Sequence, residues 1–176
     1  MKILIAGIGN LFLGDDAFGV EVVRRLAAQP LPAGVVVKDF GIRGFDLACA
    51  LQDGYDAAIL VDAIGRGSPP GTLHVLEPDT QPTQSSQNSL LEMHHLDPVR
   101  VIQLARRMGG PLPCLWVVGC EPATLEPADA EIGCLSESVR LAVEPAVELV
   151  EALAAKLLAG VTEPKGVSKV EREAIR

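Results

Sequence analysis

The sequence contains few aromatic residues, too little positive charge to balance its acidic side chains, and no long apolar run. Aromatic residues make up only 3% of the chain, so its core must be aliphatic. Acidic residues outnumber basic ones by 23 to 15, and the formal net charge is −8. This balance argues against binding to nucleic acid or to an anionic membrane, because both need a basic face. No apolar stretch approaches the ~20 residues of a membrane-spanning helix.

The sequence also has no C-x-x-C pair and no apparent signal peptide. Its four cysteines therefore do not predict a zinc knuckle, and we expect free thiols without a catalytic role. The apolar run that follows Lys2 stops at Gly7, which is too short for the core of a signal peptide. We expect a cytoplasmic protein.

Short apolar strands alternate with amphipathic helices along residues 1–158, which predicts a single α/β domain. The expected fold is a three-layer sandwich, with helices on both faces of a twisted, mostly parallel sheet. Residues 159–176 are expected to form a mobile tail, and Pro145 is expected to kink or restart the last helix. The predicted strands are 2–6, 35–40, 57–64, 113–120 and an edge strand at 71–78, and the predicted helices are 16–28, 44–52, 97–108 and 136–158.

The glycine-rich segment "GNLFLGDDAFG" follows the first predicted strand, where a nucleotide phosphate could bind. A dinucleotide fingerprint would need glycine where Phe12 stands, and a phosphate loop would need lysine where Asp15 stands. Asp15 and Asp16 would also repel a phosphate from the start of the helix. Nucleotide binding is therefore not favoured. Asp15 is expected to cap the helix, whereas for Asp16 a capping role and a functional role both stay open.

A second carboxylate, Asp62, ends the most apolar predicted strand. Ligands of such sheets bind outside the carboxyl ends of the strands, so Asp16 and Asp62 are expected to converge at one exposed crevice. Two nearby carboxylates share either a proton or a cation.

Three histidines are candidates for a nitrogen ligand at this crevice. His74 lies in an alternating segment and is expected at the surface. His94 and His95 precede a helix whose expected N-cap is Asp97, and only one of the two could point into the crevice. A pair of solvated loop histidines remains the alternative.

Together these segments resemble a known family. The blocks "GIGNLFLGDDAFG", "LVDAI" and "MHHLDP" are similar, in this order, to the motifs of the hydrogenase maturation endopeptidases. These enzymes trim the C-terminus of the large subunit of nickel–iron hydrogenases. The similarity spans roughly residues 1–155 and includes "WVVGCEPATLE", which resembles a later strand and loop of the family.

The resemblance implies a nickel-recognition site formed by Asp16, Asp62 and His94, with Asp16 or Asp62 also activating water. Many relatives have glutamate at the first position, so Asp16 is shorter by one methylene. His94 is preferred to His95 by its place in the motif. The segment "DFGIRG" (39–44) departs from the glycine-rich form of some relatives and is expected to help select the hydrogenase.

The favoured function is therefore an endopeptidase acting on the precursor of a hydrogenase large subunit, with nickel supplied by that substrate. No nucleophile elbow G-x-S-x-G and no H-E-x-x-H zinc helix occurs in the sequence. The alternative is a non-enzymatic metal-sensing or chaperone module with the same ligands. A peptidyl-tRNA hydrolase-like enzyme is suggested only by "GIGN", and the acidic charge disfavours it. The particular hydrogenase, the cleavage position and the oligomeric state stay open.

Overall fold

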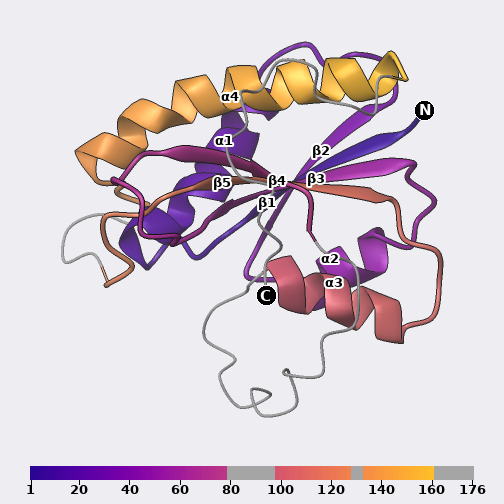
Figure 1. The fold of residues 1–176 in the computed structure, drawn as a ribbon, viewed down its shortest axis with the longest axis horizontal. Coiled ribbons are helices and arrows are strands. Elements are labelled where there is room, and N and C mark those ends of the chain that lie inside the picture. The colour runs from indigo at the N-terminus through magenta and orange to yellow at the C-terminus, as the bar shows by residue number, and fades with distance from the viewer. Residues whose placement is uncertain (79–97, 128–132, 161–176) are drawn as a thin grey trace.

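The computed structural model describes residues 1–78, 98–127 and 133–160. Within this part, five strands form one sheet in the order β2–β1–β3–β5–β4 (Figure 1). All neighbouring strands are parallel except β4, which pairs antiparallel with β5 at one edge. The strands are β1 (Ile3–Ile8), β2 (Val35–Gly41), β3 (Ala57–Ala63), β4 (Leu73–Leu76) and β5 (Cys114–Cys120).

Helices cover both faces of the sheet, which confirms the predicted three-layer α/β fold. Helices α1 and α4 lie on one face, and α2 and α3 lie on the other (Figure 1). The helical elements are the 3-10 turn η1 (Gly14–Ala17) and the helices α1 (Phe18–Ala27), α2 (Gly44–Ala50), α3 (Pro98–Arg107) and α4 (Glu137–Leu158). None of these helices has the length and apolar character needed to span a bilayer.

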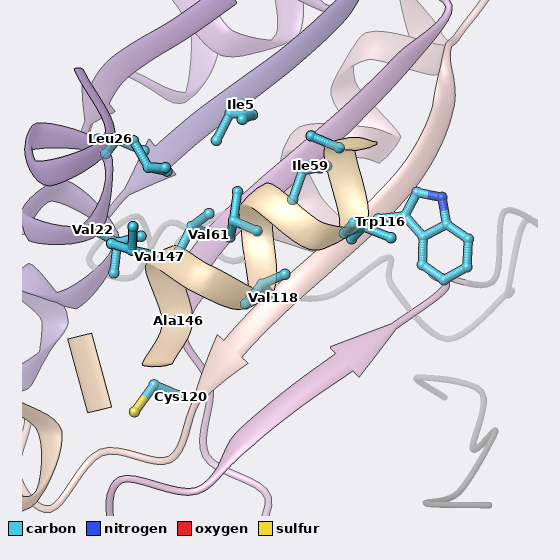
Figure 2. Packing of buried hydrophobic residues seen from close by; sticks show 14 of the residues in the cluster. Ile5, Val22, Leu26, Ile59, Val61, Trp116, Val118, Cys120, Ala146 and Val147 are labelled. Carbon is cyan, nitrogen blue, oxygen red and sulfur yellow. The ribbon is translucent and has the colours of Figure 1, made fainter. Parts of the chain in front are cut away.

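Strand alternation sends successive side chains to two separate aliphatic cores. Along β1, Ile3 and Ile5 pack towards α1 and α4, whereas Leu4 packs towards α2 and α3. Figure 2 shows part of the α1/α4 core, where strand residues such as Ile59 and Val118 lie close to the helices. Complete burial of one such side chain contributes roughly 1.5–3 kcal/mol. The cores are mainly aliphatic, as the shortage of aromatic residues predicts.

One helix prediction needs correction, and a second is narrowed. The helix predicted from residue 16 begins at Phe18, because η1 occupies the turn before it. Of the two outcomes predicted at Pro145, a restart does not occur, because α4 continues through it as one helix, and a kink stays a prediction. Pro145 lies on the exposed side, where the carbonyl that loses its N–H partner can reach water. The buried residues Val143 and Val147 on either side pack into the same core, so tertiary packing supports a continuous helix.

Several predictions fall on residues outside the described ranges. These are the loop at 79–92, the histidines His94 and His95, the Asp97 N-cap of α3, and most of the tail at 159–176.

Candidate functional site

The loops that follow β1, β2, β3 and β5 meet at one edge of the sheet, because parallel strands end on the same side. Backbone hydrogen bonds join the ends of these strands and the loops after them. Gly9 donates its N–H to the carbonyl of Gly41 at 3.1 Å, and Asp15 donates its N–H to the carbonyl of Thr124 at 3.1 Å. This carboxyl edge is where ligands of such folds bind.

Asp62 lies at this edge, as predicted, but it is buried. It is the penultimate residue of β3, pairs with Gly119 of β5, and is only 3% exposed. Its Oδ1 accepts the N–H of Ala63 at 2.9 Å. β3 lies between β1 and β5 in the middle of the sheet. The predicted crevice shared with Asp16 stays a prediction. Burial of a carboxylate is costly, so its presence at a strand end favours a functional role.

Asp16 lies in η1, which packs directly against β3. It is half-buried, and its Oδ2 accepts the N–H of Asn10 at 2.7 Å. Gly9 makes this turn possible, since a Cβ there would lie 1.8 Å from the carbonyl oxygen of Asp16. Gly19 likewise lets the start of α1 lie on the strands, because its Cβ would come within 2.1 Å of the Val61 carbonyl oxygen. Asp16 and Asp62 thus occupy neighbouring elements of one edge.

The direction of α3 shows where the chain returns to this edge. The side chain of Gln52 donates from Nε2 to the carbonyl oxygen of Ala105, near the end of α3. Gln52 follows α2 and lies at the opposite edge, where β3 begins. Helix α3 therefore begins, at Pro98, on the side of the carboxyl edge (Figure 1).

The predicted nitrogen ligand is not covered by these observations. His94 and His95 lie outside the described ranges. Within those ranges, no group of three His, Cys, Asp or Glu side chains is arranged to hold a metal ion. The three-ligand site formed by Asp16, Asp62 and His94 therefore stays a prediction.

Comparison with known proteins identifies the family. A family model described as hydrogenase maturation protease matches residues 20–153. The chain belongs to the hydrogenase maturation protease family. It is 34% identical to the hydrogenase 2 maturation protease of Escherichia coli K12, and the match covers 99% of both chains. It is 36% identical to the hydrogenase expression/formation protein HupM of Azotobacter chroococcum, over 88% of this chain and 72% of HupM.

Solved structures of the family share the fold. The hydrogenase maturating endopeptidase HybD of Escherichia coli superposes with a TM-score of 0.68 at 30% identity, covering 91% of this chain and 94% of HybD. A hydrogenase 2 maturation peptidase from a Thaumarchaeota archaeon gives 0.62 at 32% identity, covering 92% and 99%. The protein is thus an endopeptidase of hydrogenase maturation, which supports the enzymatic hypothesis over the non-enzymatic one.

In this maturation protease, Asp15 does not cap a helix as predicted. Neither η1 nor α1 has a side-chain cap, and Asp15 is fully buried. Its carboxylate accepts the N–H groups of Ala123 at 2.7 Å and Thr124 at 3.1 Å, and both the N–H and the hydroxyl of Ser136 at 2.6 and 2.9 Å. These donors offset the cost of burial and tie the loop after β1 to the loop after β5 and to the start of α4.

A third buried carboxylate, Glu121, was not foreseen from the sequence. It follows β5 and is 6% exposed, and it accepts the N–H groups of Arg66 at 2.7 Å and Gly67 at 3.0 Å. Burial by itself raises the pKa of Glu121. The backbone N–H groups of residues 66–68 and the electrostatic interaction with His74 outweigh burial and hold the pKa below its ordinary value. Its partners lie more than 50 residues away in sequence, so no local pattern indicates them.

His74 is not a surface residue, contrary to the prediction. Its side chain is only 10% exposed, and Nε2 lies 3.7 Å from Oε2 of Glu121. Among the described residues, Nε2 has no hydrogen-bond partner. Both His74 and Asp62 pair with Gly119, on opposite sides of β5, and paired residues point to the same face of a sheet. His74 therefore faces the α2/α3 layer, as Asp62 does.

The cysteines are free thiols, as predicted. Cys120 is buried at the carboxyl edge, and burial together with the negative charges of Asp15 and Glu121 raises its pKa to about 12. A thiol of this kind stays protonated at neutral pH and is a poor nucleophile. For Cys120, this supports the prediction of a cysteine without a catalytic role.

Proposed function

We propose that this maturation protease removes the C-terminal extension from the precursor of a nickel–iron hydrogenase large subunit, and that the nickel arrives with the substrate. The observation that carries the proposal is the placement of Asp16 and Asp62. In a chain that belongs to the hydrogenase maturation proteases, these carboxylates lie on neighbouring elements at the edge where α/β sheets bind ligands.

The proposed recognition site consists of Asp16, Asp62 and His94. Carboxylate oxygen and imidazole nitrogen suit a borderline metal such as nickel. Support for His94 comes from the direction of α3, which begins at the carboxyl edge four residues later in the sequence. An ion partly held by the large subunit would use these side chains as additional ligands and so bridge the two proteins. Either carboxylate could then accept a proton from the attacking water.

The exposed apolar side chains support a protein substrate. Phe12, Ile42 and Phe45 are 63%, 62% and 64% exposed. All three follow the carboxyl ends of β1 or β2, and the Gly9–Gly41 hydrogen bond joins their loops. Two of the four phenylalanines in a chain with few aromatic residues are thus exposed in the segments that follow β1 and β2. Exposed apolar groups gathered at a site are typical of protein–protein contact. We propose that they contact the large subunit next to its C-terminal extension.

Mass spectrometry of the nickel-loaded precursor tests the proposed function. Incubation with the purified wild-type protein should yield a large subunit shortened at its C-terminus. The His94→Ala variant should yield none, whereas the matched control His95→Ala should retain most of the activity. An intact precursor after incubation with the folded wild-type protein would contradict the proposal. A reversed order of the two histidine variants would show that His95 is the ligand instead.

A further inference from the structure

Glu121 connects to both ends of the loop between β3 and β4. Its backbone N–H donates to the carbonyl of Thr72 at 2.9 Å, and its carbonyl accepts the N–H of Gly71 at 2.8 Å. Its buried side chain reaches the other end of the loop, where Oε2 accepts from Arg66 and Oε1 from Gly67. One residue thus holds the beginning and the end of the loop together.

This loop begins immediately beyond Asp62. Only Ala63 completes β3, and the N–H of Ile64 donates to the carbonyl of Cys120 at 2.8 Å. The following sequence, "GRGSPPG", supplies little stiffness of its own around Gly67, whose φ is +79° and whose Cβ position has no neighbouring atom within 4 Å. The pairing with β5 holds the chain as far as Ile64, and beyond it the conformation of the loop at Arg66 and Gly67 depends on the hydrogen bonds that the Glu121 carboxylate accepts.

We propose that Glu121 is a positioning residue of the proteolytic site. Its carboxylate fixes the loop beyond Asp62, and the loop in turn fixes the direction in which the Asp62 carboxylate points. This inference rests on the proposed function, in which Asp62 contacts the reacting atoms. Glu121 acts only through the loop, and the His74 ring beside Oε2 restricts the room for another position of the carboxylate.

The kinetic consequence follows from the geometry of the reaction. Loss of the carboxylate leaves the N–H groups of Arg66 and Gly67 without their acceptors, so the loop must rearrange. A small displacement of a reacting group lowers the rate of the chemical step much more than it weakens substrate binding. Loss of an outer partner that orients a catalytic side chain typically costs about 10- to 100-fold in activity.

Kinetics of precursor cleavage test this role. Glu121→Ala should lower kcat about 10- to 100-fold while KM stays within about twofold. Glu121→Gln keeps one oxygen acceptor, so it should recover part of the loss. Glu126→Ala is the matched control, because Glu126 is an exposed glutamate of the same loop after β5. A folded Glu121→Ala enzyme with wild-type kcat would overturn the proposal, as would a rise in KM alone.

Amide hydrogen exchange in the substrate-free protein provides a second test. The amides of Arg66 and Gly67 should exchange faster in Glu121→Ala than in wild type, and Glu126→Ala should not change them. If the wild-type protein leaves the precursor intact, the proposed function fails, but unchanged exchange in the variant would separately overturn the role of Glu121. If Glu121→Ala does not fold, Glu121→Gln decides: slower cleavage and faster exchange support the role, and wild-type behaviour in both overturns it.

Discussion

At the carboxyl edge, the two faces of the sheet carry different kinds of buried residue. On the α1/α4 face, Val61, Val118 and Cys120 continue the apolar core to the ends of the strands. On the α2/α3 face, the neighbouring positions hold Asp62 and, across Gly119, His74. The strand residues on the first face are explained by packing, and its buried carboxylate Asp15 has hydrogen-bond donors from the loop after β5 and the start of α4. Polar strand residues on the second face are costly to bury, which supports our proposal that this face serves the reaction.

The largest effect should come from Asp62. Asp62→Asn keeps the size of the side chain but removes its charge, so it should lower kcat for precursor cleavage about 100- to 10,000-fold. Its thermal unfolding should stay close to that of wild type. A kcat of Asp62→Asn within a few-fold of the wild-type value would contradict the assignment of a reactive role to the α2/α3 face.

A substitution on the other face should have the opposite effect. Ile59 is fully buried against α1 and α4, and Ile59→Ala should lower the free energy of unfolding by about 2–5 kcal/mol. Because Ile59 is remote from the reacting groups, the molecules that remain folded should cleave with nearly wild-type kcat. Urea unfolding and active-site-normalised kinetics measure the two quantities. A specific loss of kcat without destabilisation would contradict this assignment.

The apolar loops at the edge should affect substrate binding and not the chemical step. Phe12→Ser should raise KM for the precursor about tenfold and leave kcat unchanged, since exposed aromatic residues often dominate protein–protein contacts. Leu141→Ser is the matched control, because Leu141 is equally exposed at 61% but lies on α4. Equal KM values for the two variants would show that the Phe12 loop does not contact the large subunit.

The smallest expected effect is a pH dependence of stability from Glu121. Its pKa is lower in the folded protein than in the unfolded chain, so the charged form favours folding. This contribution is complete above the ordinary glutamate pKa of about 4.3 and is lost as the pH falls through the lower folded value. The stability difference between wild type and Glu121→Gln should therefore shrink on acidification from pH 7 to below about 4. Urea unfolding measures this difference in the free energy of unfolding, and a value that stays constant from pH 7 to below about 4 would contradict the prediction.

The fold was predictable because its signals are local. Apolar runs such as "AAILVDAI" predict buried strands within one or two residues, and the aliphatic faces of α1 and α4 follow a helical period. At Pro145 the local signal left a kink and a restart open, and a restart is prevented because the neighbours Val143 and Val147 pack against distant partners across the core.

The buried polar contacts were less predictable because they join residues that are distant in sequence. The Asp15 carboxylate accepts hydrogen bonds from residues 123, 124 and 136, and the Glu121 carboxylate accepts them from residues 66 and 67. The residues next to Asp15 in sequence predict a helix cap, and those next to Glu121 predict no role for it. His74 was predicted to be exposed because apolar and polar residues alternate along its strand. It is buried beside Gly119 of β5 and Glu121 of the following loop, which are distant in sequence.

The measurement that tests the central claim most directly is cleavage of the precursor with and without nickel. Purified wild-type protein is incubated with nickel-loaded and nickel-free large-subunit precursor, and the shortened product is quantified by mass spectrometry. If Asp16, Asp62 and His94 recognise an ion that the substrate carries, only the loaded precursor is cleaved. Equal cleavage of the nickel-free precursor would contradict nickel recognition, even though the protein would still be a protease.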